Sequence, residues 1–131
     1  MKPRNPPVFF LDRSLGKCDV PTALRDADYT YKIHDEHFPP NTPDQEWMAR
    51  LDRRWIVLTK DEKIRYRPLE LQALRDAGLR VFIVICGNVR GTETARIIVD
   101  AIPRIIAAVQ RTKGPCVFYV YKNSTIRRAR C

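Results

Sequence analysis

Short, wholly apolar runs alternate along this chain with longer stretches in which apolar residues recur at helical spacing. The clearest run is Trp55–Leu58, four bulky apolar residues followed by Thr59, Lys60 and Asp61. Such a run is too short for a helix and rich in strand formers, which is typical of a strand buried on both faces in a parallel sheet. Similar patterns predict strands over residues 8–11, 29–33, 55–58, 80–85 and 116–121.

Helical spacing and end signals predict four connecting helices. Thr42 as N-cap, Pro43 at the first helical position and Gln45 three residues after Thr42 make a capping box. Gly78 is a helix stop. Pro103 lies inside the last helix, where a proline costs about 3 kcal/mol, so we expect a kink or a restart there. The predicted helices cover residues 20–27, 42–51, 68–77 and 92–111.

This alternation of strands and helices predicts a three-layer α/β/α sandwich around a central, mostly parallel five-stranded sheet. A length of 131 residues is typical of one domain, so we expect a single domain over residues 1–131. Its ends are expected to be an extended, proline-containing lead-in over residues 1–7 and a basic tail over residues 122–131.

The charge of the chain favours a polyanionic partner. Lys and Arg outnumber Asp and Glu by 24 to 15, for a formal net charge of +9, which suits nucleic acid or an acidic protein, although such an excess can also serve solubility alone. No apolar run approaches the roughly 20 residues of a bilayer span, and no signal-type stretch follows Met1–Arg4. No helix sets a basic face against large apolar residues. We therefore expect a cytoplasmic protein with no membrane partner.

The positions of the cysteines and histidines do not favour a zinc site. No Cys-x-x-Cys pair is present, and Cys86 and Cys116 lie in apolar runs as buried small hydrophobes. His34 and His37 lie in a predicted loop without the helical HExxH context, which disfavours a histidine-bound transition metal.

Carboxylates follow the ends of several predicted elements. Asp12 follows the first strand, Asp35 or Glu36 the second, and Asp61 the central one. Asp44 lies in the first turn of a predicted helix, on the same face as the apolar residues of that helix. Its side chain either points toward the sheet or only complements the helix dipole. Carboxylates that share a pocket raise one another's pKa or bind a hard divalent cation. A basic surface around such a pocket suits metal-dependent cleavage of a phosphodiester.

Three motifs resemble the PIN-like branch of the PIN-domain superfamily. They are Phe10–Gly16, then Asp44–Trp47, then Leu58–Asp61 followed by Ile64-Arg65 and Pro68–Glu70. The resemblance runs from about Val8 to about Ile126. It implies a ribonuclease that depends on Mg²⁺ or Mn²⁺, and small bacterial members are commonly toxins of VapC-type toxin–antitoxin pairs.

The resemblance also implies roles for individual residues. Asp12, Asp44 and Asp61 would be catalytic metal ligands, with Asp35 or Glu36 as a more variable metal-binding acid. Thr59 would support the site by orienting Asp61. Residues expected to contact RNA are Arg13, Lys60, Lys63, Arg65 and Arg67. Where standard members carry a further acid after the Asp61 position, this chain has the basic run around Arg65, and Glu70 is interpreted as an ordinary solvated helical glutamate.

The leading hypothesis is therefore a metal-dependent endoribonuclease, the toxin of a type II pair, with RNA as substrate and a cognate antitoxin as partner. A homodimer is a further expectation. The alternative is a non-catalytic PIN-like module that binds RNA or protein. A receiver-like phosphoacceptor is disfavoured, because Thr59, Lys60 and Asp61 are adjacent here, whereas a receiver draws such residues from separate strands.

Overall fold

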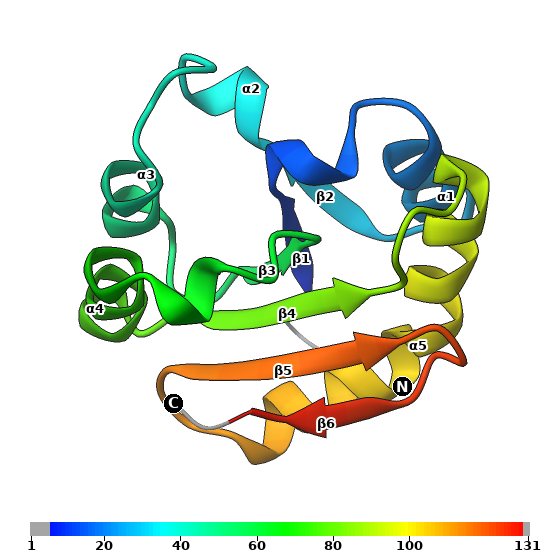
Figure 1. Ribbon diagram of the computed structural model, residues 1–131. Helices are drawn as coiled ribbons and strands as arrows, with labels where there is room; N and C mark the ends of the chain where they lie inside the picture. Colours follow the sequence, from blue (N-terminus) through cyan, green and yellow to red (C-terminus); the bar gives the residue numbers. More distant parts are fainter. Residues whose placement is uncertain (1–5, 130–131) are drawn as a thin grey trace.

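The structure, a computed structural model, describes residues 6–129, apart from the side chain of Arg65 (Figure 1). Its strands are β1 Val8–Leu11, β2 Thr30–Ile33, β3 Ile56–Thr59, β4 Arg80–Ile85, β5 Cys116–Tyr121 and β6 Ile126–Arg128. Its α-helices are α1 Asp19–Asp26, α2 His34–His37, α3 Asp44–Arg50, α4 Pro68–Ala77 and α5 Gly91–Arg111. Two 3₁₀ turns, η1 Arg13–Leu15 and η2 Ile64–Tyr66, follow β1 and β3.

The strands form one sheet in the order β2-β1-β3-β4-β5-β6. The pairs up to β4–β5 are parallel, and β6 pairs antiparallel with β5. The predicted α/β fold with a mostly parallel sheet is confirmed, but the predicted count of five strands is wrong. The sixth strand lies in the predicted basic tail, where a turn with Ser124 at φ 65° reverses the chain. Strand pairing uses the backbone, so Arg127 and Arg128 can take part although they break the apolar pattern.

Two helical layers cover the sheet, as the sandwich prediction requires. Figure 1 shows α1 and α5 together on one side and α3 and α4 together on the other. Side chains alternate along a strand, so Phe9 and Leu11 of β1 belong to the core beneath α1 and α5. Phe10 belongs to the second core cluster, with Trp47 and Met48 of α3. Both faces of the central strands are thus buried, which explains their continuous apolar runs.

Most predicted boundaries agree with the structure to within two residues. The bounds of β1, β4, β5 and α4 are those predicted from the sequence. Pro68 starts α4, and Gly78 ends it in the left-handed conformation at φ 68°, which a glycine adopts without steric cost. Cys86 and Cys116 are buried, as expected of small hydrophobes.

Two local predictions are wrong. Thr42 donates its hydroxyl to the carbonyl of Pro39 at 2.7 Å, so it caps a turn, and α3 begins at Asp44 without a side-chain cap. The predicted loop at His34–His37 is the short helix α2. Of the two outcomes expected at Pro103, a kink or a restart, the restart does not occur, because α5 is one helix whose long buried apolar face stabilises it.

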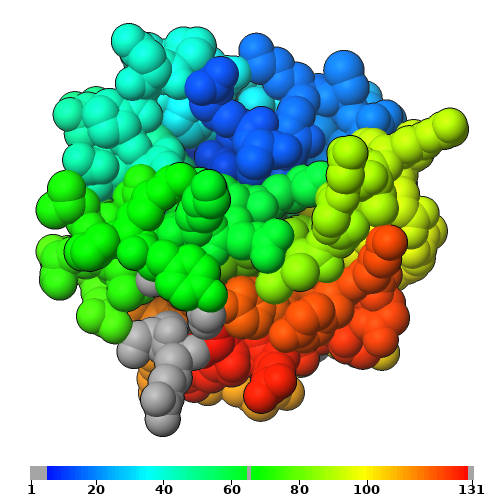
Figure 2. All heavy atoms as spheres, viewed as in Figure 1, coloured from blue at the N-terminus to red at the C-terminus, as the bar shows by residue number. Residues whose placement is uncertain are grey.

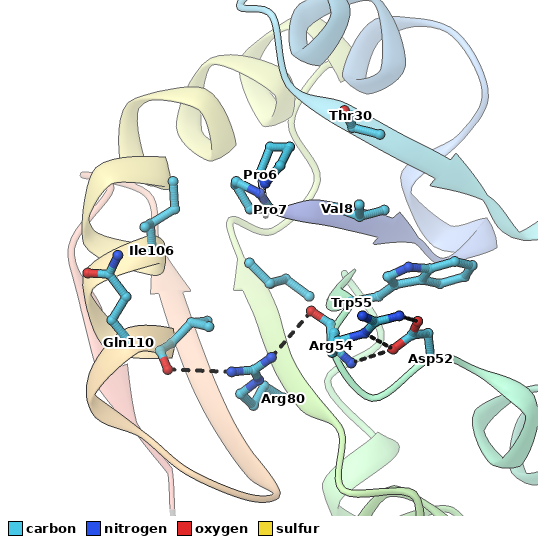
Figure 3. Close-up of a pocket in the computed structure, with 12 residues that line it drawn as sticks. Pro6, Pro7, Val8, Thr30, Asp52, Arg54, Trp55, Arg80, Ile106 and Gln110 are labelled. Carbon is cyan, nitrogen blue, oxygen red and sulfur yellow. Dashed lines mark hydrogen bonds and ion pairs between the residues drawn. The ribbon is translucent and has the colours of Figure 1, made fainter. Parts of the chain in front are cut away.

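The amino ends of the strands surround a cavity of about 460 Å³ (Figure 3). Arg80, the first residue of β4, donates from its guanidinium to the carbonyl of Val109 at 3.4 Å. It also reaches the carbonyls of Arg53 and Arg54, at 3.5 and 3.3 Å. Val109 lies in the last turn of α5, so Arg80 complements the negative end of this helix and joins it to the loop before β3. This cavity lies at the sheet edge opposite to the acids of interest.

Helix length and composition also bear on the membrane prediction. Within residues 6–129, no helix is both long enough and apolar enough to cross a bilayer.

Candidate functional site

The candidate site lies at the carboxyl ends of β1 and β3, two neighbouring strands of the sheet. Because β2 and β3 lie on opposite sides of β1, the carboxyl ends of β1 and β3 form a switch point, where open α/β sheets bind ligands. Asp12 lies two residues beyond Phe10, and Thr59 lies two beyond Val57. Alternation therefore turns both Asp12 and Thr59 toward the face covered by α3 and α4. Figure 2 shows the segment after β1, in blue, against the segment after β3, in green.

Asp12, Ser14 and Thr59 form a hydrogen-bonded group, here called the Asp12 network. The Asp12 carboxylate accepts from the hydroxyls of Ser14 and Thr59, both at 2.8 Å, and those hydroxyl oxygens lie 3.2 Å apart. The Ser14 hydroxyl also accepts from the backbone N–H of Lys60 at 2.9 Å. Asp12 and Thr59 are buried. The network therefore fixes the ends of β1 and β3 against each other.

Sequence reasoning missed Ser14 as a site residue. The signal that could have found it is the Asp-x-Ser spacing, because an aspartate often accepts from groups two residues later. Here Asp12 caps η1 and accepts from the Ser14 backbone N–H at 3.4 Å as well as from its hydroxyl.

Thr59 is also hydrogen-bonded to the backbone of Asp61. The Thr59 hydroxyl oxygen accepts from the backbone N–H of Asp61 at 3.0 Å while it donates to Asp12. The Asp61 carboxylate in turn accepts from the backbone N–H of Lys63 at 3.0 Å. Thr59 thus links Asp12 to Asp61 through one hydroxyl, and its bond to Asp61 is to the backbone.

Three carboxylates surround one cation in what is here called the Arg67 cluster. Nη1 of Arg67 lies 3.0 Å from Asp61, 3.4 Å from Glu70 and 3.7 Å from Asp44. The negative charge of Asp61, and then that of Glu70, raises the pKa of the Arg67 guanidinium. Arg67, which the sequence assigned to RNA contact, is therefore engaged with acids contributed by α3, α4 and the loop after β3.

Glu70 is not the solvated helical glutamate inferred from the sequence. Its side chain is only 12% exposed. Burial raises the pKa of its carboxyl, the neighbouring Asp44 raises it further, and Arg67 opposes this. Asp44 also accepts from the indole N–H of Trp47 at 2.8 Å. The packing of α3 against α4 therefore adds a fourth acid that sequence spacing did not reveal.

The acids after β2 lie in different surroundings. Asp35 forms ion pairs with Arg13 and Lys17, both at 3.2 Å, and contacts Nδ1 of His34 at 2.9 Å. The hydrogen bond with His34, and then Lys17 and Arg13, lower the pKa of the Asp35 carboxyl. Glu36 is exposed. No contact between either acid and the Arg67 cluster is found in the described residues.

The remaining predicted RNA contacts lie around this edge. Lys60 lines a hollow of about 230 Å³ with Lys17 and Ser14, and Lys63 is exposed beside Asp61. Arg13 donates to the carbonyl of Pro40 at 2.6 Å in addition to its ion pair with Asp35. The prediction for Arg65 concerns a side chain outside the described residues.

The donor set fits a hard divalent cation such as Mg²⁺ or Mn²⁺ in chemistry and in charge. All the donors are oxygens, and the Arg67 cluster already holds a positive group among them. Its N–O distances of 3.0–3.7 Å exceed the about 2.1 Å of a magnesium–oxygen bond. Over residues 6–129, no three His, Cys, Asp or Glu side chains are grouped so that they could hold a metal ion. Metal binding would require Arg67 to leave and the carboxylates to move closer together.

Comparisons with known proteins cover this site. A family model described as "PIN like domain" matches residues 7–85, which contain both the Asp12 network and the Arg67 cluster. Among curated proteins, "Putative ribonuclease VapC45" of Mycobacterium tuberculosis (strain ATCC 25618 / H37Rv) is 30% identical over 123 residues, which cover 90% of this chain and 88% of that protein. No solved structure matches the chain.

Proposed function

Because the chain belongs to the PIN-like domain family, we propose that it is a metal-dependent endoribonuclease whose centre is the edge formed by Asp12, Asp44 and Asp61. One observation carries the proposal: carboxylates from three separate segments gather around a positive group at the switch point of the sheet. The ribonuclease name of the Mycobacterium tuberculosis relative supports this reading. The formal net charge of +9 suits RNA as the substrate.

The residues that would hold the cation are Asp12, Asp44 and Asp61, and we add Glu70. Asp44, Asp61 and Glu70 already share one positive partner in the Arg67 cluster. Asp12 is joined to Asp61 through Thr59. When bound there, Mg²⁺ or Mn²⁺ would supply the positive charge that activates water and stabilises the leaving oxygen of a phosphodiester. The protein's own contribution is to orient the carboxylates, with Ser14 and Thr59 holding Asp12 and the Trp47 indole holding Asp44.

Cations on either side of this edge would hold the RNA backbone. Lys60 and Lys17 line the hollow next to Ser14, and Lys63 is exposed beside Asp61. Arg67 would turn from the carboxylates to a phosphate when the metal replaces it, because a guanidinium binds phosphate with the same geometry as carboxylate.

The test is a cleavage assay on single-stranded RNA in Mn²⁺, in Mg²⁺ and in EDTA. We expect cleavage by the wild type with either metal, none in EDTA, and a loss of at least about 100-fold in Asp12→Asn and Asp61→Asn. The matched control is Asp76→Asn, because Asp76 lies on the exposed side of α4, where it accepts from Gln72. Aspartate variants that cleave as fast as the wild type would refute the proposal.

A second candidate is a PIN-like module that binds RNA without cleaving it. The observation that favours it is Arg67, which already neutralises part of the acidic cluster and would compete with a metal ion. RNA binding without metal-dependent turnover would select this candidate.

The family resemblance also leads us to propose a type II toxin, cytoplasmic and inhibited by a cognate antitoxin, with a homodimer as its assembly. Co-expression with the product of a neighbouring gene tests the pairing. We expect a stable complex that lacks RNA cleavage, and light scattering of the isolated chain gives the number of copies.

A further inference from the structure

The exposed large apolar side chains of the described residues are concentrated in one place. Tyr66 is 67% exposed and Leu69 is 70% exposed, and only Arg67 and Pro68 separate them. Large exposed apolar groups that gather at one spot mark binding surfaces more often than chance exposure does. This spot lies where η2 leads into α4, directly beside the Arg67 cluster.

The backbone of Tyr66 is held firmly on both sides. Ile64, two residues before it, is 1% exposed and belongs to the core beneath α3 and α4. The Tyr66 N–H donates to the carbonyl of Lys63 at 2.9 Å. The backbone N–H of Arg67, the next residue, donates to the carbonyl of Ile64 at 3.4 Å. An aromatic ring on a backbone fixed in this way loses little conformational entropy when a ligand covers it.

The surroundings of Tyr66 are those of a single-stranded nucleic acid site. Lys63 is exposed three residues before it, and the loop also carries Lys60. Single-stranded RNA is held by such a combination, in which cations contact phosphates and an aromatic ring stacks on an unpaired base. The carboxylates of Asp44, Asp61 and Glu70 surround the Arg67 guanidinium and repel phosphates, so we expect phosphates at the lysines.

Leu69 differs from Tyr66 in its neighbours. It lines a shallow groove between α3 and α4 together with Gln45, Ala49, Gln72 and Ala73. Tyr66 is absent from the residues that line this groove. Tyr66 therefore lies outside the groove that Leu69 lines, and its exposed ring belongs to the segment between Lys63 and Arg67.

We propose that Tyr66 is a base-stacking residue that positions an unpaired base of the RNA beside the Arg67 cluster. The inference rests on the proposed function for RNA as the ligand. It goes beyond that function by naming the side chain that stacks on a base.

The experiment measures the binding of a labelled single-stranded RNA of about 12 nucleotides in EDTA, so that the RNA stays intact whether or not the protein is a nuclease. We expect Tyr66→Ala to weaken binding about tenfold, as the loss of one base–aromatic stack does, and Tyr66→Phe to bind like the wild type. Leu69→Ala, which removes an equally exposed apolar group without a ring, should also bind like the wild type.

Salt dependence separates stacking from charge. The slope of log K against log salt should be unchanged in Tyr66→Ala, whereas Lys63→Ala should reduce it by about 0.7, the value for one phosphate contact on a single strand. An RNA that lacks its bases should bind equally to the wild type and to Tyr66→Ala.

Equal binding by Tyr66→Ala and the wild type would overturn the inference and leave the exposed pair to a protein partner. Equally weak binding by Leu69→Ala, or by Tyr66→Phe, would also overturn it. Failure of the nuclease proposal has a different signature, namely Tyr66-dependent binding with no cleavage when Mn²⁺ or Mg²⁺ is added.

Discussion

Replacing Thr59 by valine tests the Asp12 network through stability alone. Thr59 is 0% exposed, and valine preserves both its shape and its branched β-carbon, so packing and strand propensity are kept. The substitution removes the hydrogen bond to the Asp12 carboxylate, and such bonds to charged groups contribute about 1.5–3 kcal/mol. It also leaves the Asp61 N–H without its acceptor, which costs about 1 kcal/mol at a partly buried site. We expect the free energy of unfolding to fall by about 2.5–4 kcal/mol, a large share of the roughly 5–15 kcal/mol of a typical domain.

The assay is equilibrium unfolding in urea, with Thr94→Val as the matched control. Thr94 is also a buried threonine, but its hydroxyl donates only to a neutral acceptor, the carbonyl of Arg90 at 3.3 Å, with a weak contact to the Cys86 sulfur at 3.8 Å. Its replacement should cost about 1 kcal/mol or less. If Thr59→Val costs no more than Thr94→Val at an unchanged m-value, the interpretation of Thr59 as the link between Asp12 and Asp61 is wrong.

Three further predictions concern charge. Arg67→Gln should tighten Mn²⁺ binding about fivefold in titration calorimetry, because the half-exposed ion pair that the metal must replace is worth up to about 1 kcal/mol. Arg75→Gln, the control on the exposed face of α4, should leave Mn²⁺ binding unchanged. Weaker Mn²⁺ binding by Arg67→Gln would contradict this prediction. Hydrogen bonds from Arg54 lower the pKa of Asp52 to about 2 from its ordinary 3.8, so this pair stabilises the fold above about pH 4. The contribution of this pair is lost as the pH falls toward 2. In denaturant titrations, the free energies of unfolding of the wild type and Asp52→Asn should therefore converge near pH 2. A difference between the two proteins that stays constant with pH would count against this prediction. Burial raises the pKa of Glu70, so the ionised carboxylate destabilises the fold. The melting temperature of Glu70→Gln should therefore exceed that of the wild type near neutral pH but not near pH 4. A lower melting temperature of Glu70→Gln at neutral pH would oppose this prediction.

The elements that followed directly from the sequence were those with a local cause. The apolar runs of β1, β4 and β5 can be buried on both faces only as strands of a covered sheet. Pro68 and Gly78 mark the start and the end of α4 through their own backbone geometry. The position of Asp12 and Asp61 at one edge also followed, because the carboxyl ends of parallel strands meet there, whereas the hydrogen bond from Thr59 to Asp12 did not.

The features that the sequence did not reveal depend on the packing of separate elements or on a choice between competing hydrogen bonds. The environment of Glu70 is set by how α4 packs against α3, since Asp44 reaches it from α3 and adds to the effect of the neighbouring Arg67. The Thr42 hydroxyl could accept from a backbone N–H at the helix start or donate to a nearby carbonyl, and in the structure it donates to the carbonyl of Pro39. The pattern of β6 was hidden because its charged side chains lie on the exposed outer strand, where the backbone alone makes the pairing.

The outermost position of β6 has a consequence for the solubility of the protein. β5 is a run of six largely apolar residues, Cys116–Tyr121, whose outer backbone groups pair with β6. Without β6, this row of donors and acceptors would be an open template for another chain, and exposed apolar edges of this kind lead to intermolecular sheets. The strand that covers it is only three residues long and carries the exposed Arg127 and Arg128, features that discourage a further strand from adding. A chain that stopped at Asn123 should therefore aggregate even though the candidate site is intact.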